Sequence, residues 1–180
     1  MTITGAVSVD ALLAVANSYH QPEAREPGDG NGAKWLPAHD HLETPQEAMA
    51  YLGRHGLRLA ERPHSRQLAS LREIREAAQL FATNQRANAR RVSQLLHGAR
   101  FQLDAEGRLV PLRPGCDGLI DALLIALVEL RGEADRIKRC GNDQCRWLFI
   151  DRSKNRSRQW CESATCGNRQ RVRRFRRRAA

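Results

Sequence analysis

Apolar side chains in the first part of the chain recur every three or four residues, a spacing that predicts amphipathic α-helices. A first helix begins after Ser8, whose hydroxyl can accept a hydrogen bond from the free N–H groups of the first turn. A second begins at Thr44 and Pro45, a capping residue followed by an N1 proline, and ends near Gly56. Residues 21–37 lie between these helices, are rich in proline, glycine and charge, and are expected to form a long loop.

Three further elements are predicted in the same region. Residues 65–96 keep the helical period, as one bent helix or as two. Apolar and polar residues alternate within 101–110, on both sides of a turn at Gly107, and this pattern predicts a small β-hairpin. Residues 117–133 are apolar on most sides and predict the central, buried helix. The expected fold class is mainly α, with a helical N-terminal domain followed by a small C-terminal module, residues 136–180.

Four of the five cysteines form two equally spaced pairs near the C-terminus. Cytosolic thiols stay reduced, so no disulfide framework is expected in a chain without an export signal. Four thiolates on two short loops suit the tetrahedral preference of structural zinc and leave no position for a catalytic water. A redox-active thiol set and an iron–sulfur cluster are the alternatives, although the spacing matches no usual cluster pattern. The predicted zinc ligands are Cys140, Cys145, Cys161 and Cys166.

The residues between the cysteine pairs predict a miniature core over the metal. Residues 147–150 form a short apolar strand, and Trp160 adjoins the third ligand. We interpret these aromatic side chains as packing residues rather than as stacking surfaces for bases, because so small a module has few other core residues. Zinc binding contributes on the order of 10 kcal/mol to the folding of such modules, so this one should unfold without metal. Cys116, outside the pairs, is expected to be a small packed side chain.

Charge is distributed unevenly along the chain. The net charge is +10, but residues 136–180 carry 15 basic against 3 acidic residues, whereas residues 1–135 carry 15 against 17. Clustering of this kind indicates two modules, the second with a polyanionic partner. No segment is long and apolar enough to span a membrane, and the N-terminus lacks the basic start of a secretory signal. We therefore expect a cytoplasmic protein without a membrane partner.

The residues after Cys166 predict a helix that presents arginine on most of its surface. Val172, Phe175 and Ala179 fall on one stripe, which we expect to dock on the zinc core and to leave the guanidinium groups facing outward. Arginine binds phosphate with two hydrogen bonds and can also contact guanine edges, which favours a nucleic-acid partner. The predicted nucleic-acid-binding residues are Lys154, Arg156, Arg158, Arg169, Arg171, Arg173, Arg174, Arg176, Arg177 and Arg178.

The sequence Cys166-Gly167-Asn168-Arg169, preceded by Trp160-Cys161, resembles the CGNR zinc-finger family of bacterial proteins. The resemblance implies that the four cysteines bind zinc and that the module binds DNA, as in proposed stress-induced transcription regulators. In that family the finger follows a mostly helical domain known as ABATE, with which Leu71-Arg72-Glu73-Ile74 and other N-terminal residues are compatible. The implied organisation is an ABATE-like regulatory domain at 1–135 and a CGNR-type finger at 136–180.

The sequence leaves several functions open. The leading hypothesis is a nucleoid-associated transcription regulator that binds double-stranded DNA, while its N-terminal domain binds a small-molecule or protein effector or forms a homodimer. An RNA-binding or ribosome-associated protein and a zinc-thiolate redox switch are the alternatives. No enzyme is expected, because His39 and His41 lack a third ligand at a recognisable spacing and no phosphate-binding loop or nucleophile motif occurs.

Overall fold

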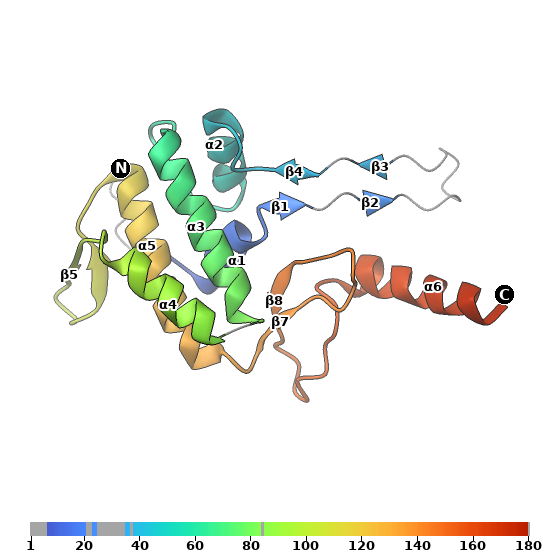
Figure 1. The fold of residues 1–180 in the computed structure, drawn as a ribbon. Coiled ribbons are helices and arrows are strands. Elements are labelled where there is room, and N and C mark those ends of the chain that lie inside the picture. Colours follow the sequence, from blue (N-terminus) through green and yellow to red (C-terminus); the bar gives the residue numbers. More distant parts are fainter. Residues whose placement is uncertain (1–6, 21–22, 25–34, 37, 84, 180) are drawn as a thin grey trace. The chain divides into compact units, whose positions relative to one another are not determined.

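The structure is a computed structural model and describes residues 7–20, 23–24, 35–36, 38–83 and 85–179. Its internal contacts divide the chain into two units, both drawn in Figure 1. The helical unit contains the residues up to Ser18 together with His41–Ala134, and the second unit contains Tyr19–Asp40 together with Asp135–Ala180. The domain division expected from the sequence, 1–135 and 136–180, stays a prediction.

The periodic apolar segments form five α-helices in the described part of the helical unit. Their starts follow the capping residues: the hydroxyl of Ser8 accepts from the Ala11 N–H, and that of Thr44 accepts from the Glu47 N–H. The segment 65–96 is two helices rather than one. The bounds are α1 (Val9–Ala16), α2 (Pro45–Arg54), α3 (Ser65–Phe81), α4 (Gln85–Leu96) and α5 (Gly115–Glu129), which a 3₁₀ turn, η1 (Leu130–Glu133), extends.

Helix α5 is the central element of the helical unit, as its apolar sequence predicts. It contacts α1, α3 and α4, and α3 in turn contacts α1 and α4. Leu119 and Leu123 on α5, Leu71 on α3 and Leu12 on α1 are inaccessible to solvent. Full burial of one such side chain stabilises a fold by about 1.5–3 kcal/mol, so this core needs no metal to hold it.

Two polar contacts fix the edges of this core. The Tyr51 hydroxyl donates a hydrogen bond of 2.8 Å to the Ala14 carbonyl, which joins α2 to α1. The Arg113 guanidinium donates hydrogen bonds of 2.7 and 2.5 Å to both carboxylate oxygens of Asp121, a buried residue on α5. The predicted hairpin is confirmed just before Arg113, as the antiparallel strands β5 (Phe101–Leu103) and β6 (Leu109–Pro111).

The stretch expected to be a loop contains short strands. β1 (Tyr19–His20) pairs with β4 (His39–Asp40), and β2 (Glu23–Ala24) pairs with β3 (Trp35–Leu36), both antiparallel. Figure 1 shows β1 and β2 running alongside β4 and β3. The loop prediction, which covered 21–37, was wrong for β2 and β3, because backbone pairing holds these residues and two-residue strands leave no period in the sequence. The rest of 21–37 lies outside the described residues.

The C-terminal part of the second unit has short strands and a helix, as predicted. Its strands β7 (Ile137–Arg139) and β8 (Leu148–Ile150) are antiparallel, with Lys138 opposite Phe149. A single π-helical turn, η2 (Ser163–Gly167), leads directly into the basic helix α6 (Asn168–Ala179). The expected fold class, mainly α with a small cysteine-containing module at the C-terminus, is confirmed. No helix in the described part of the chain is long and apolar enough to cross a membrane.

Candidate metal centre and basic helix

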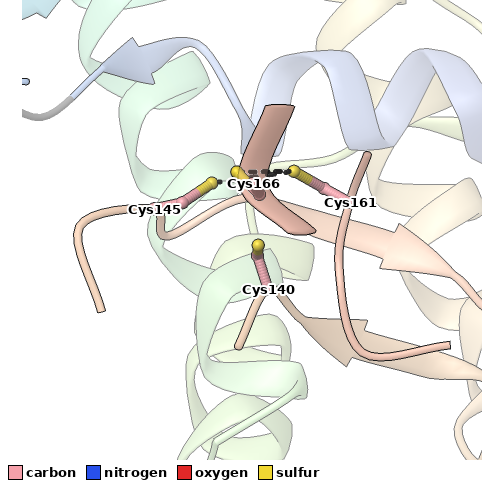
Figure 2. A group of neighbouring side chains, drawn as sticks. All are labelled: Cys140, Cys145, Cys161 and Cys166. Atoms are coloured by element: carbon pink, nitrogen blue, oxygen red, sulfur yellow. Dashed lines mark hydrogen bonds between the residues drawn. The ribbon is translucent and has the colours of Figure 1, made fainter. Parts of the chain in front are cut away.

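The four paired cysteines come together at one point of the second unit. Cys140 and Cys145 lie in the turn between β7 and β8, Cys161 lies just before η2, and Cys166 lies inside it. Their sulfur atoms are all within 4.8 Å of one another, and Figure 2 shows them pointing toward a common centre. Among the described residues, this is the single group of three or more potential metal ligands that lie close enough to share an ion.

Two of the distances between sulfur atoms are those expected in a tetrahedral zinc site. The Sγ atoms of Cys145 and Cys161 are 3.7 Å apart, and those of Cys161 and Cys166 are 3.6 Å apart. Four sulfurs at about 2.3 Å from a central zinc are about 3.8 Å from one another in a regular tetrahedron. A disulfide would bring two of them to about 2.05 Å. The arrangement therefore suits a bound ion and not a covalent bridge.

The acid–base chemistry of the donor set also favours a bound cation. Hydrogen bonding with the Cys161 thiol lowers the pKa of Cys145 to about 6. Hydrogen bonding with Cys145, together with burial, raises the pKa of Cys161 above its ordinary value. Neighbouring sulfurs thus ionise at one another's expense, because like charges repel at this distance. A divalent ion removes that conflict and allows all four to be thiolates.

Trp160 explains why glycine follows two of the four ligands. A β-carbon added to Gly141 would lie 3.0 Å from the indole ring, and one added to Gly167 would also lie 3.0 Å from it. The indole is therefore held between the backbone segments that follow Cys140 and Cys166. Its packing role was predicted, but the pairing with two glycines becomes visible only when the two Cys-Gly-Asn sequences meet in space.

Asn142 is a site residue that the sequence reasoning missed. Its side chain is 1% exposed, and its amide donates to the Cys166 sulfur at 3.6 Å. Its carbonyl oxygen accepts from the Gln170 amide at 3.3 Å and from the Arg173 guanidinium at 3.4 Å, both on α6. Asn142 therefore connects a zinc ligand to the basic helix, as partners behind metal ligands commonly orient the ligands they touch. The available signal was the repeat of Cys-Gly-Asn at 140–142 and 166–168.

Asp151 organises the loop between the cysteine pairs. Its carboxylate is fully buried and accepts hydrogen bonds from the Lys138 ammonium at 2.6 Å, the Ser153 hydroxyl at 2.5 Å and the Arg158 N–H at 2.9 Å. Burial by itself would raise the pKa of Asp151, but these hydrogen bonds hold it far below its usual range. The ionised carboxylate of Asp151 therefore holds the loop between β8 and Trp160 in place through these hydrogen bonds.

Several predicted nucleic-acid-binding residues have partners within the second unit. Arg156 pairs with Asp135, and Arg158 donates to the carbonyls of Trp160 and Cys161. Arg173 hydrogen-bonds to the Gln144 side chain as well as to Asn142. These three arginines therefore hold the module together, whatever else they contact. Six of the seven remaining predicted residues are exposed, namely Lys154, Arg171, Arg174, Arg176, Arg177 and Arg178, and Arg171 also donates to the Ser163 carbonyl at 3.4 Å.

The expected docking of α6 through its apolar stripe is wrong. Phe175 is 74% exposed, whereas Gln170 and Arg173 are half-buried against Asn142. The helix lies on the metal site through polar side chains because the surface that it meets there is the buried amide of Asn142, which needs hydrogen-bond partners. Phe175 is thereby turned away from the zinc site.

The predicted miniature core is confirmed in part. Leu148, Phe149 and Ile150 on β8 are buried, and Phe149 lies beneath the Arg158 guanidinium at 4.9 Å from the ring centre. Trp147 is 38% exposed, so its assignment to the core was wrong. It precedes β8 and supplies its backbone carbonyl, rather than its ring, to the site by accepting from the Cys140 N–H at 2.8 Å.

Comparison with known protein families agrees with a metal site in this region. Residues 136–179 match the CGNR zinc finger. The match confirms the predicted resemblance for the C-terminal region and gives the metal its identity, because four clustered cysteines in a zinc-finger module bind zinc. Four sulfur ligands complete the tetrahedral coordination that zinc prefers. No curated protein matches the chain.

Cys116 and His41 take no part in this site. Cys116 lies at the start of α5 in the helical unit, where burial, reinforced by the charge of Asp117, raises the pKa of its thiol to about 12. A thiol with that pKa is almost entirely protonated at neutral pH and is a poor nucleophile. His41 stacks on Tyr51 with ring centres 4.4 Å apart, a packing contact of the helical unit.

Proposed function

We propose that this zinc-binding protein is a bacterial transcription regulator that binds double-stranded DNA through its CGNR finger. The observation that carries the proposal is α6: it bears seven arginines and no acidic residue, and Asn142 ties it to the zinc site. Arginine in this density suits phosphate recognition, and a helix fixed to a rigid module loses little conformational freedom when it binds.

Binding should be strongly dependent on salt. If five to eight of the basic side chains contact phosphates, log K falls with log salt at a slope of roughly −5 to −7. Fluorescence anisotropy with a labelled duplex of random sequence, from low to physiological salt, measures this slope. A slope near zero would contradict the proposal.

The decisive experiment compares nucleic acids at matched salt. Duplex DNA, single-stranded DNA and a structured RNA are titrated with the zinc-loaded protein, with Cys161→Ser as the unfolded-finger variant and Cys116→Ser as the matched control. We expect tightest binding to duplex DNA, loss of binding in Cys161→Ser and no change in Cys116→Ser. Stronger binding to RNA would assign the module to an RNA-binding protein instead.

Sequence preference distinguishes a regulator from a non-specific binder. Selection of bound fragments from random duplex DNA should enrich a sequence for the native protein and none for Cys161→Ser. Recovery of fragments without sequence bias would mean that the protein binds DNA non-specifically. That result would contradict the proposed role in transcription regulation and would be consistent with DNA binding.

The helical unit would then carry the regulatory function. Its buried core and its resemblance to ABATE support a separate sensing or interaction domain, and a cavity of about 210 Å³ lined by His64, Arg66 and Arg113 among others offers space for a small effector. A ligand bound there would raise the unfolding temperature of this unit, because it binds only the folded state. A screen of small anions and metabolite-sized acids by thermal unfolding tests this part.

A zinc-thiolate redox switch is the second candidate. Cys145 and Cys161 are only half-buried, which leaves two of the four ligands open to oxidants, whereas Cys140 and Cys166 are buried. Oxidation of zinc thiolates releases the metal and would melt the module. Zinc release by micromolar peroxide, followed with a chromogenic chelator, supports this function, and a site inert to millimolar peroxide removes it.

A further inference from the structure

The exposed aromatic residue on α6 has no structural role in the module that carries it. Phe175 is 74% exposed, although it is one of only four phenylalanines in the chain and sits on a helix that could have buried it. The zinc-facing side of the helix is instead occupied by Gln170 and Arg173. A surface that only contacts phosphates gains nothing from a large apolar side chain, so its exposure calls for a partner.

The helical geometry places Phe175 at the centre of the outward face. With about 100° of rotation for each residue, Phe175 lies about 160° from Arg173 and about 140° from Gln170, the two side chains that dock on the metal site. Arg171 and Arg178 lie within about 60° of it on one side, and Val172 lies about 60° away on the other. Phe175, bordered by guanidinium groups, therefore points away from the zinc site, whereas Val172 is half-buried.

The charge around Phe175 indicates what covers it. No acidic side chain occurs in α6, and Arg174 and Arg178 beside Phe175 are exposed. A protein or lipid surface covering this face would have to neutralise an entire helix of arginines, whereas a nucleic acid does so with its backbone and also offers apolar base surfaces between the phosphates. An α-helix with its side chains is about 10–12 Å across, which matches the width of the DNA major groove.

We propose that the outward face of α6 enters the major groove of DNA, with Phe175 against the C5-methyl group of thymine and the flanking arginines on the phosphates. The inference rests on the proposed DNA binding and adds its orientation and its apolar contact to bases. Phenylalanine reads thymine through this methyl group because it is the one apolar feature on the major-groove edges. The zinc site and Asn142 act here as the support that turns this face outward.

The test removes the methyl group and the phenyl ring in turn. A thymine-containing duplex obtained by selection, and the same duplex with deoxyuridine in place of thymine, are titrated with native protein and with Phe175→Ala. We expect native protein to bind the thymine duplex roughly 4-fold more tightly than the deoxyuridine duplex, and Phe175→Ala to bind both equally weakly. Phe175→Leu should retain part of the preference. Because Phe175 is exposed, zinc content and helicity should be unchanged in both variants.

Arg174→Ala is the matched control on the same turn. Arg174→Ala should reduce the steepness of log K against log salt by about 1 and weaken binding to both duplexes equally. Phe175→Ala should leave this slope unchanged. If native protein binds DNA but does not distinguish the two duplexes, or if Phe175→Ala binds like native protein, the base contact is overturned and the proposed function stands. If native protein binds neither duplex, the proposed function itself fails.

Discussion

The two units of this chain stabilise their helices by opposite means. In the helical unit, α5 is surrounded by apolar side chains such as Leu119 and Leu123, which are inaccessible to solvent. In the second unit, α6 is fastened by hydrogen bonds to Asn142, and its large apolar side chain, Phe175, faces outward. A helix that buries its apolar face uses that face for folding. A helix held through its polar side keeps its apolar face available for a partner.

The comparison also separates what depends on metal from what does not. The helical unit has a core large enough to stabilise it by burial alone. The CGNR finger has few core residues, and its buried polar groups Asn142 and Asp151 are arranged around the zinc ligands and the loop between them. Loss of zinc should therefore affect one unit and spare the other, and four experiments test this difference.

The largest effect is expected for Cys161→Ser. Zinc binding contributes on the order of 10 kcal/mol to the folding of small modules, so the variant should lose its zinc and residues 136–179 should unfold. The helical unit should keep its protection against amide hydrogen exchange. Amide hydrogen exchange followed along the chain, together with the zinc content, measures both. Cys116→Ser, which alters a cysteine outside the site, serves as control. Retention of one zinc per chain with unchanged exchange in the variant would contradict a four-cysteine site.

Leu123→Ala should produce the converse result. Truncation of this inaccessible side chain in α5 should lower the free energy of unfolding of the helical unit by about 2–5 kcal/mol. The zinc content and the exchange of the CGNR finger should stay as in native protein. Val128→Ala on the same helix, where the side chain is 38% exposed, is the control and should change stability little. If Leu123→Ala also released zinc, the two units would not be independent.

Asn142→Ala should weaken zinc binding without abolishing it. Removal of a group that supports a metal ligand typically lowers metal affinity about 10- to 100-fold, and α6 would also lose two hydrogen bonds. Competition with a chelator of known affinity measures the first effect, and hydrogen exchange of α6 the second. Asn155→Ala, at an exposed asparagine in the loop between the cysteine pairs, should leave both unchanged. Native affinity in Asn142→Ala would show that Asn142 does not support the site.

The smallest effect is expected at Cys116. The pKa of its thiol, raised to about 12 mainly by burial, means that the nucleophilic thiolate is present only above about that pH, and at pH 8 only about one thiol in ten thousand is ionised. Iodoacetamide at pH 8 should therefore leave Cys116 unmodified in the folded protein, as mass spectrometry of its peptide would show. The zinc cysteines should become reactive after chelation. Rapid alkylation of Cys116 would mean that the helical unit opens far more easily than its core implies.

Much of the fold could be predicted because it depends on local signals. Ser8 and Thr44 cap helices where their sequence context indicates, and the apolar run at 117–133 became the buried helix. The paired strands at 19–20, 23–24, 35–36 and 39–40 could not be predicted, because their hydrogen bonds join residues far apart in the chain and two-residue strands carry no period.

The candidate site divides in the same way. Equal spacing of two cysteine pairs identified the metal ligands and even the metal, since thiolate chemistry and loop length together leave few alternatives. Trp147 and Phe175 were both assigned to the core and are both exposed, because the apolar character of a side chain does not say which face of its element is covered.

By itself, the sequence determined that this chain is mainly helical, that it binds zinc through Cys140, Cys145, Cys161 and Cys166, and that its basic charge is gathered at one end. The tertiary structure decided how that charge is presented. The buried amide of Asn142 requires hydrogen-bond partners, and the polar side of α6 supplies them, so Arg173 turns inward and Phe175 outward. Helical periodicity alone places the two residues on opposite faces, but only the contacts of the folded chain select which face meets the zinc site.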